Sequence, residues 1–451
     1  MTTNAVILAA GQGTRMHSSA AKALIELGGV PLVEHVVRAV ENSGLQSPWV
    51  VVGFQAERVE EALEGRVQTV WQSELKGTGH ALATALRALP KETEQVVVLL
   101  ADGPLVPPEM IQMLIAEQER TGAAVTMVTA RLDDPTGYGR VVRGPDGGIA
   151  AVIEEKEADD QIRQICEVNT GIGIWRVSGL LPVLEQLPFR GQEQYLTEAV
   201  ATLIAQGAVV RAVEAKDPGL VMGINTRREL AAAELRLRQM TINRLFDHGV
   251  SIVDPASTFI DAEVEVGQDT IIYPMTVLRG KCRIGKGCRL GPATSITASR
   301  LGDDVTVERS VVEQSVIGNH STVGPFSHLR AGSLLDREVH VGNFVELKNT
   351  RVGMGTKMGH HSYLGDATVG SQVNIGAGTV VVNYDGHEKH QTFIGDQAFI
   401  GCNSNLVAPL EIGSGAYIAA GSTITQNVPA ESLAIARNRQ EVKPGWAKDR
   451  R

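Results

Sequence analysis

One aliphatic column with a six-residue spacing constrains this fold more than any other feature. In the C-terminal half, aliphatic residues recur at every sixth position, over residues 260–296 and again over residues 394–424. Neither the 3.6-residue period of a helix nor the two-residue period of a strand produces this spacing. A hexapeptide period is typical of a parallel β-helix, in which each hexapeptide forms one flat side of a triangular coil. The column consists of Ile260, Val266, Ile272, Leu278, Ile284, Leu290 and Ile296, then Ile394, Ile400, Leu406, Ile412, Ile418 and Ile424.

A second column, two positions earlier, consists mostly of small residues, which we expect to fill the narrow interior beside the large ones. Its first members are Thr258, Val264, Thr270, Thr276, Cys282, Cys288 and Thr294. Cys282 and Cys288 are therefore expected to be packing residues. The other two cysteines are Cys166 and Cys402, and no CxxC pair occurs, so the sequence indicates neither a disulfide framework nor a zinc site.

The composition is that of a globular protein with two or three domains. Of 451 residues, 43% are apolar and 21% charged. The net charge of −9 disfavours nucleic acid or an anionic membrane as a partner, so local basic residues and backbone amides must hold any anionic substrate. The apolar run from Ala5 to Ala10 is too short for a signal peptide, and no stretch approaches a transmembrane span. We expect a cytoplasmic protein.

Residues 1–228 alternate short aliphatic strands with helical stretches, the pattern of a parallel α/β sheet. The first strand, residues 5–10, leads into a glycine-rich turn, residues 11–16, which is expected to open a helix. Glycines let backbone amides approach a phosphate, and Arg15 and Lys22 add positive charge. A tight connection without a ligand is equally compatible with the spacing, because the Walker lysine and the third glycine of a dinucleotide fingerprint are absent.

A helical arm is expected over residues 229–249. Leu230, Leu235, Leu237, Met240 and Leu245 have helical spacing, and Gly249 ends the run. His248 is expected in the last turn, where a cation is favoured, with no catalytic role.

The motif Leu8-Ala9-Ala10-Gly11-Gln12-Gly13-Thr14-Arg15-Met16, followed by Lys22, resembles the signature of sugar-1-phosphate nucleotidyltransferases. Together with the β-helix it resembles the bacterial bifunctional N-acetylglucosamine-1-phosphate uridylyltransferases/glucosamine-1-phosphate N-acetyltransferases, over essentially the whole chain. The resemblance implies a Rossmann-like uridylyltransferase domain at residues 1–228, the helical arm at 229–249, and a left-handed parallel β-helix with N-acetyltransferase activity at 250–451. It further implies synthesis of UDP-N-acetylglucosamine for peptidoglycan and lipopolysaccharide precursors, from glucosamine-1-phosphate, acetyl-CoA and UTP, with Mg²⁺.

The resemblance also assigns residues of the first site. Nucleotide and sugar contacts carry over to Leu8, Ala9, Ala10, Gly11, Arg15, Lys22, Gln72, Gly77, Thr78, Gly139, Glu154, Asn169 and Asn225. The Mg²⁺ ligands carry over to Asp102 and Asn225, although a strand-end aspartate that caps a turn is an alternative for Asp102. Uracil offers one N–H donor and carbonyl acceptors, which an amide side chain such as Gln72 can complement.

For the second site the resemblance assigns His360 as the catalytic base, since histidine titrates near physiological pH and can take the proton of the attacking amine. A solvent-exposed histidine is the default alternative, and is the interpretation of His361. Sugar-phosphate contacts carry over to Arg330, Lys348, Tyr363 and Asn374, and acetyl-CoA contacts to Ala377, Asn383, Tyr384, Cys402, Ala420 and Arg437. A solvated basic face is the alternative for Arg330 and Lys348.

Three positions depart from the family pattern: Ala21 stands where proline is usual, Ala101 where glycine is usual and Cys402 where serine is more usual. The hexapeptide register is also broken by an insertion, since Val381 to Ile394 is a step of thirteen residues. A polar loop ejected there would suit the homotrimer that the resemblance implies.

Two rival functions remain at this stage. The β-helix could serve only for oligomerisation or regulation, or the chain could be a non-catalytic sugar-nucleotide sensor. The Arg330, Lys348, His360 and Tyr363 set disfavours the first rival, and the Asp102/Asn225 pair disfavours the second. Rates, strictness of sugar choice and channelling between the sites do not follow from the sequence.

Overall fold

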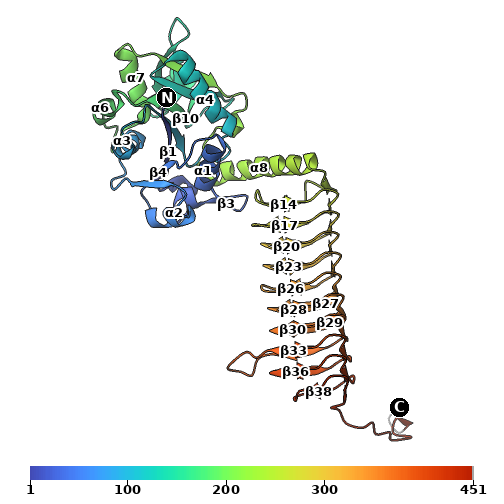
Figure 1. Cartoon of the computed structure of the whole chain (residues 1–451). Coiled ribbons are helices and arrows are strands. Elements are labelled where there is room, and N and C mark those ends of the chain that lie inside the picture. Colours follow the sequence, from blue (N-terminus) through green and yellow to red (C-terminus); the bar gives the residue numbers. More distant parts are fainter. Residues whose placement is uncertain (449–451) are drawn as a thin grey trace. The chain divides into compact units, whose positions relative to one another are not determined.

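The computed structural model describes residues 1–448, which form two compact units, Met1–Leu237 and the part of the chain that begins at Arg238 (Figure 1). The first unit is built on a sheet with the strand order β11-β7-β10-β6-β1-β4-β5, to which the β8–β9 hairpin is added at β10. The strands are β1 (Thr3–Leu8), β4 (Trp49–Val52), β5 (Gln68–Trp71), β6 (Gln95–Leu100), β7 (Val125–Arg131), β8 (Arg140–Arg143), β9 (Ile149–Ile153), β10 (Glu167–Arg176) and β11 (Val210–Glu214).

The expected α/β class is confirmed, but the sheet is not wholly parallel. Strand β10 runs antiparallel to both β6 and β7, whereas β1, β4, β5, β6, β7 and β11 pair in parallel. A parallel connection needs a crossover of a dozen or more residues, usually a helix. The chain reaches β10 instead through the β8–β9 hairpin and the four-residue helix α5 (Asp160–Arg163), so it enters the sheet in the opposite direction.

Helices cover both faces of this sheet because strand β1 is apolar at every position along its buried length. Val6 belongs to a core cluster with α3 (Thr78–Ala88), α6 (Leu180–Glu185) and α7 (Leu196–Ala205). Its neighbour Ile7 packs in the opposite cluster, with α1 (Leu32–Asn42), α2 (Ala56–Ala62) and α4 (Pro108–Thr121). The glycine-rich motif lies in the loop at the carboxyl end of this buried strand, which is where ligands bind in open α/β sheets.

The expected helical arm is α8 (Arg227–Asp247), which ends where Gly249 takes a positive φ of 78°. Nδ1 of His248 lies 2.6 Å from the carbonyl oxygen of Arg244, in the last turn as expected. Leu245 is buried, but Leu235 and Met240 are exposed, so the helical spacing does not correspond to one continuous buried stripe.

The second unit is a stack of coils with parallel pairing between neighbours, which confirms the β-helix (Figure 1). Phe259 pairs with Val277, eighteen residues on, as three hexapeptides require. Ser295 pairs with Val311, only sixteen residues on, and these shortened coils explain why the hexapeptide register drifts. One ladder consists of β14 (Glu265–Val266), β17 (Arg283–Ile284), β20 (Arg300–Leu301), β23 (Val316–Ile317), β26 (Leu334–Leu335), β28 (Arg351–Val352), β30 (Ala367–Val369), β33 (Thr392–Ile394) and β36 (Leu410–Ile412); the second sheet runs from β12 (Ser251–Ile252) to β39 (Leu433–Ala434).

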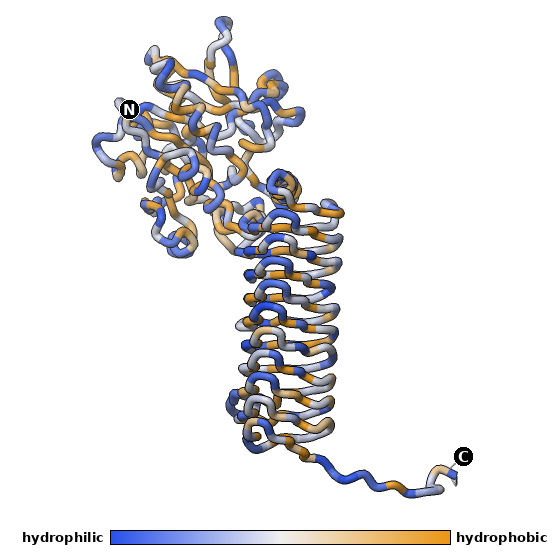
Figure 2. The backbone as a smooth tube through the Cα atoms, turned by 45° about the vertical axis from the view of Figure 1, so that its right-hand side comes forward, coloured by the Kyte–Doolittle hydropathy of each residue, from blue (hydrophilic) through white to orange (hydrophobic). Residues whose placement is uncertain are grey.

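Both predicted columns point inward. The large column is buried except for Val266, which is partly buried, and the small column is buried throughout, including Cys282 and Cys288. Figure 2 shows hydrophobic positions recurring in coil after coil. Some hydroxyls of the small column bond to the backbone of the next coil, as where Thr270 Oγ1 donates to the carbonyl oxygen of Gly285 at 2.9 Å. Thr258 Oγ1 donates instead to Asp254 in its own coil, and Thr392 Oγ1 has no partner among the described residues. At Thr270 the narrow interior is therefore filled without an unsatisfied hydroxyl.

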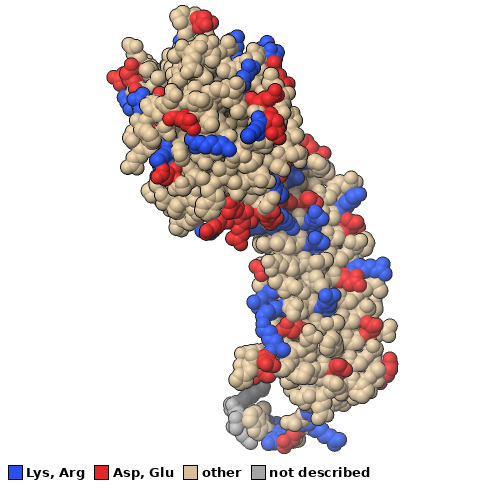
Figure 3. All heavy atoms as spheres, turned by 60° about the vertical axis from the view of Figure 1, so that its left-hand side comes forward, with Lys and Arg blue, Asp and Glu red and all other residues tan. Residues whose placement is uncertain are grey.

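Basic and acidic side chains are interspersed over the face of the molecule drawn in Figure 3. Within residues 1–448, no helix has the length and apolar character needed to cross a membrane.

Two candidate active sites

The loop after β1 lines a cavity of about 460 Å³ in the first unit. The expected helix after the glycines is wrong, since residues Thr14–Met16 form only one 3₁₀ turn. Gly13 and His17, which flank this turn, both have left-handed backbone angles, so a helix cannot propagate through them. Positive charge at this loop therefore comes from side chains rather than from a helix terminus.

Eleven of the sequence-assigned residues line this cavity together: Leu8, Ala9, Ala10, Gly11, Arg15, Lys22, Gln72, Gly77, Thr78, Asp102 and Asn225. A second cavity, of about 300 Å³, contains Gly139, Glu154 and Asn169. Arg15, Asp102 and Asn225 line both cavities, so these three side chains lie where the cavities meet. The structure thus brings all the assigned residues of the first site into one bipartite cleft.

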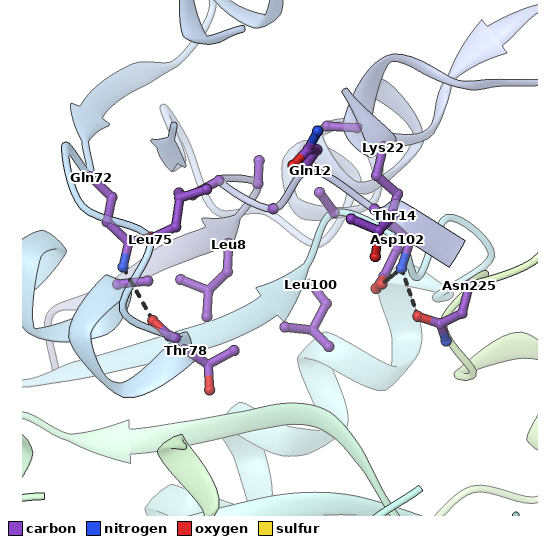
Figure 4. Close-up of a pocket in the computed structure, with 18 of the residues that line it drawn as sticks. Leu8, Gln12, Thr14, Lys22, Gln72, Leu75, Thr78, Leu100, Asp102 and Asn225 are labelled. Carbon is purple, nitrogen blue, oxygen red and sulfur yellow. Dashed lines mark hydrogen bonds and ion pairs between the residues drawn. The ribbon is translucent and has the colours of Figure 1, made fainter. Parts of the chain in front are cut away.

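Four polar side chains form a network at this junction. Lys22 makes an ion pair with Asp102, and its Nζ also donates to Oδ1 of Asn225 at 2.8 Å. Arg15 Nη2 donates to the same amide oxygen at 2.8 Å. Figure 4 shows Lys22, Asp102 and Asn225 directed toward one another at one end of the cavity, with Gln72 and Thr78 at the other. The ammonium of Lys22 therefore lies between a carboxylate oxygen and an amide oxygen at the junction.

The second carboxylate oxygen of Asp102, Oδ1, is buried and has no hydrogen-bond partner among the residues that the structure describes. A buried anionic oxygen without a partner is costly and is a common feature of ligand sites. Its neighbour Oδ2 and Asn225 Oδ1 both contact the ammonium of Lys22. Oxygen donors of this kind fit a hard divalent cation.

Glu154 lies in the wall of the second cavity, where Thr197 Oγ1 donates to its Oε1 at 2.8 Å. Burial raises the pKa of Glu154, and the hydrogen bond from Thr197 offsets part of that effect. Tyr138 lines the same cavity, and burial likewise raises the pKa of its hydroxyl. This cavity combines hydrogen-bonding groups with the apolar side chains of Met127, Trp175 and Val200, which suits a small ligand that has both polar and apolar groups.

The backbone amides of both departures, Ala21 and Ala101, donate hydrogen bonds. The amide of Ala21 donates to Gln55 Oε1 at 2.9 Å, a bond that a proline at this position would lack. The amide of Ala101 donates to the carbonyl oxygen of Leu8 at 3.0 Å, which ties the approach to Asp102 to the end of β1.

In the second unit, His360 lies at a corner within the long strand β29 (Lys357–Gly365) and is exposed. It pairs in register with Asn343 of β27 (His340–Lys348), and its Nδ1 lies 2.6 Å from Oδ1 of Asn343. An amide oxygen can only accept, so in the neutral ring Nδ1 carries the proton and Nε2 has the free lone pair. The next residue, His361, is exposed and its ring stacks on Phe344 with 4.9 Å between centroids.

The assigned acetyl-CoA contacts continue along the same corner of later coils. The amide of Asn403 donates to the carbonyl oxygen of Ala377 at 2.7 Å, and the amide of Gly421 donates to that of Cys402 at 2.8 Å. Ala420 precedes Gly421, and the side chain of Arg437 lies beside Gly421. Cys402 is exposed in this row of small residues, so its thiol is accessible rather than packed inside.

Basic side chains lie close together in the β-helix: Arg330, Lys348 and Lys389. Lys348 pairs in register with Gly365, and its pKa is lowered, chiefly by contact with Lys389 and to a lesser extent by Arg330. Three positive groups close together fit an anionic ligand such as a sugar phosphate. Arg330 also makes an ion pair with Glu346, with 3.0 Å between Nη1 and Oε1.

Tyr363 and Asn383 converge over Gly365. A Cβ at Gly365 would lie 2.4 Å from the Tyr363 hydroxyl and 2.8 Å from Asn383 Nδ2, so the glycine leaves room for both. Asn383 Nδ2 donates to Asp366 Oδ2 at 2.6 Å. Asn374 is exposed on β31 (Asn374–Ile375), three residues before Ala377 at the corner.

The inserted loop lies between β32 (Val380–Val382) and β33, and it is ordered by its own hydrogen bonds. Asp385 accepts from the amides of His387 and Glu388, both at 2.8 Å, and contacts Nε2 of His390 at 2.7 Å. These bonds, that of Glu388 foremost, hold the pKa of Asp385 well below its usual range. Tyr384 remains 56% exposed on this loop.

Sequence reasoning overlooked Asn343, Lys389, Thr197 and His80. Asn343 and Thr197 contact assigned residues that are 17 and 43 positions away, so only the fold brings them together. The coil length of the β-helix could have identified Asn343, because a residue one coil before His360 lies beside it at the same corner. Lys389 lies in the inserted loop that the sequence predicted, and its positive charge could have identified it as a ligand-binding candidate.

Comparisons with protein families divide the chain in the same way. Residues 5–171 match the family model of the MobA-like NTP transferase domain. Residues 255–354 match the GMPPB C-terminal domain, and residues 391–426 match the bacterial transferase hexapeptide (six repeats).

Similar proteins align over nearly the full length. The bifunctional protein GlmU of Heliobacterium modesticaldum is 46% identical over 98% of this chain and 97% of that protein. GlmU of Acetivibrio thermocellus is 44% identical over 98% of this chain and 96% of its own length, and GlmU of an Exiguobacterium species is 45% identical over 98% and 99%. Because such identity extends over both units, the chain belongs to the family of bifunctional GlmU proteins.

Proposed function

We propose that the chain is a two-site enzyme that makes UDP-N-acetylglucosamine. The β-helix acetylates glucosamine-1-phosphate with acetyl-CoA, and the N-terminal unit then couples N-acetylglucosamine-1-phosphate to UTP and releases pyrophosphate. The observation that carries the N-terminal assignment is the pair of cavities that meet at Asp102, Asn225 and Arg15. A nucleotide in one cavity and a sugar phosphate in the other would bring their phosphates together at this junction.

In the uridylyl transfer, a phosphate oxygen of the sugar attacks the α-phosphorus of UTP, and the bond to the β-phosphate oxygen breaks. The nucleophile is already an anion, so positioning and charge neutralisation are the main catalytic requirements. Lys22 and Arg15 supply positive charge at the junction. Gly139, Glu154 and Asn169 hold the sugar in the second cavity.

Asp102 and Asn225 would hold Mg²⁺ at this junction, a role that the unpartnered Oδ1 of Asp102 supports. Such an ion neutralises charge on the phosphates when it is bound. Lys22 contacts both of these side chains, and its ammonium becomes available to a nucleotide when it leaves Asp102.

In the acetyl transfer, the sugar amine attacks the thioester carbonyl, a C–N bond forms and the C–S bond breaks. His360 Nε2 takes the amine proton and returns it to the leaving sulfur, so CoA leaves as the thiol. Asn343 supports this role because its amide oxygen holds the ring proton on Nδ1. Arg330 and Lys348 bind the sugar phosphate, and Tyr363 and Asn374 its ring. The corner row of Ala377, Cys402, Ala420 and Arg437, with Asn383 and Tyr384, binds acetyl-CoA.

We also propose that the β-helix assembles as a homotrimer. The ordered loop with its exposed Tyr384 offers a side chain to a second copy of the chain. The expected mass in multi-angle light scattering is three times the 48.1 kDa chain mass. A single-chain mass at working concentration would contradict this assembly.

The test of the proposed function is a split assay on the wild-type protein. One reaction contains glucosamine-1-phosphate and acetyl-CoA, with free thiol as the readout. The other contains N-acetylglucosamine-1-phosphate, UTP and Mg²⁺, with pyrophosphate as the readout. Both products are expected. Pyrophosphate without thiol would make the β-helix a scaffold, and neither product would favour a non-catalytic sensor.

Replacing Asn343 with alanine is expected to lower kcat for thiol release by about tenfold, because the imidazole loses the acceptor that fixes its tautomer. Asn343→Asp keeps an acceptor but adds a negative charge, which favours the imidazolium. The acidic limb of its pH–rate profile is therefore expected to move to higher pH. Pyrophosphate release is the internal control, and identical profiles for wild type and Asn343→Asp would contradict the contact.

A further inference from the structure

The side chain of Gln72, which follows β5, is fixed at the floor of the nucleotide cavity. It is 4% exposed, and its backbone amide donates to the carbonyl oxygen of Val52 at 2.8 Å. Its Nε2 lies 3.2 Å from the carbonyl oxygen of Gly77 and 2.9 Å from Nδ1 of His80. Figure 4 shows the amide nitrogen of Gln72 directed to the turn that precedes Thr78.

The carbonyl oxygen of Gly77 only accepts hydrogen bonds, so it is one of the two groups that hold the amide nitrogen of Gln72 on this side. The turn that carries this carbonyl is held in place on both sides of Gly77 by Gln194. The amide of Gln194 donates to the carbonyl oxygen of Lys76 at 2.8 Å, and the amide of Gly79 donates to that of Gln194 at 2.9 Å. Gly77 has a φ of 91°, and a Cβ there would lie 2.6 Å from the Gln194 oxygen, so the turn requires glycine.

The second hydrogen of the Gln72 amide points to His80, in the first turn of α3. Nδ1 of His80 must then be an acceptor, which requires a neutral ring with its proton on Nε2. Burial lowers the pKa of His80, and the charges of Lys76 and Arg87 lower it further, whereas Glu74 opposes them. The neutral ring is therefore the form present at neutral pH.

Both hydrogens of the amide are thus engaged, and the amide oxygen receives no hydrogen bond from any residue within 1–448. Gln72 lines the cavity, whereas His80 lies behind it. We infer that His80 is a positioning residue that turns the Gln72 oxygen toward the N3–H of uracil and so sets the choice of uridine over cytidine nucleotides. This inference rests on the proposed uridylyltransferase function. Cytosine presents a lone pair at N3, and two facing acceptors repel each other.

The experiment compares kcat/KM for UTP and CTP in wild type, His80→Leu and His80→Asn, with pyrophosphate as the readout. Leucine removes the nearer of the two acceptors of Gln72 Nε2 and leaves only the contact of 3.2 Å with the Gly77 carbonyl, so the amide of Gln72 is held less firmly and can rotate to present its nitrogen to cytosine. The UTP/CTP ratio is then expected to fall about tenfold, the size of one hydrogen bond. Asparagine places an amide oxygen near the position of Nδ1 and is expected to restore most of the ratio. Thiol release reports whether the rest of the chain is intact.

If His80→Leu only disturbed the folding around α3, kcat/KM would fall equally for UTP and CTP and the UTP/CTP ratio would stay unchanged. That result would overturn the inference. A double variant tests the route through Gln72. If His80 acts through it, His80→Leu has no further effect on the ratio in a Gln72→Ala background, whereas an additional fall in the double variant would overturn the inference. Wild type that uses neither nucleotide would overturn the proposed function, and the inference with it.

Discussion

Replacing His360 with alanine is expected to reduce thiol release about 10³-fold, while pyrophosphate release stays within twofold of wild type. General-base catalysis by a positioned side chain contributes 10²–10⁴-fold, and His360 is the imidazole whose tautomer is held by Asn343. The ring is exposed, so its removal leaves no buried cavity and little effect on unfolding is expected. The two assays described above, run on the same preparation, measure this effect.

The neighbouring histidine provides the matched control. His361 is also exposed, and its ring stacks on Phe344, whereas the ring of His360 contacts Asn343. We expect His361→Ala to change thiol release less than threefold. If His361→Ala were the inactive variant and His360→Ala active, the base would be assigned to the wrong residue of the pair.

The β-helix could be predicted from the sequence because its period is imposed by geometry at every coil. Each inward position must be apolar or small. Residues of the same type as Ile260 and Thr258 therefore return at each coil, and the pattern is visible without knowledge of long-range contacts. The insertion after Val382 was visible for the same reason, as a step that the period does not allow. The shortened coils near Val311 were not, because a loss of one or two residues looks like drift.

The first site was predictable where one contiguous motif carries the chemistry, as in the loop from Leu8 to Arg15. The contacts that hold these site residues in place were not predictable, because they join residues that only the tertiary fold brings together. His80 contacts Gln72 from a helix, and Thr197 contacts Glu154 in the wall of the second cavity. The 3₁₀ turn after Gly13 was mistaken for a helix because left-handed backbone angles at a histidine have no reliable sequence signal.

Replacing Asp102 with asparagine is expected to lower kcat for pyrophosphate release about 10³-fold and to leave thiol release unchanged. The carboxylate has two functions at the junction, since Oδ2 pairs with Lys22 and Oδ1 is buried without a partner. Asparagine keeps the shape of the side chain but removes its charge, so both the ion pair and the proposed cation site lose their anion. An effect of about 4 kcal/mol on the barrier is typical when a preorganised charge is lost from an active site.

Stability is expected to change less than activity. The Lys22 and Asp102 side chains are 14% and 19% exposed, so the pair is partly solvated, and Asn225 remains as a partner for the ammonium. We expect a loss of about 1 kcal/mol in the free energy of unfolding, measured in urea. The control is Asp160→Asn, because that side chain is 97% exposed and should affect neither assay.

Cation binding separates a metal ligand from a partner of Lys22 alone. If Asp102 holds the cation, Mn²⁺ binding by Asp102→Asn, measured by calorimetry without nucleotide, should be at least tenfold weaker than in wild type. Lys22→Met should bind Mn²⁺ more tightly than wild type, because the ammonium that occupies the space between Asp102 and Asn225 is gone. Unchanged Mn²⁺ affinity in Asp102→Asn, together with lost pyrophosphate release, would restrict Asp102 to orienting Lys22 and would place the cation elsewhere in the cleft.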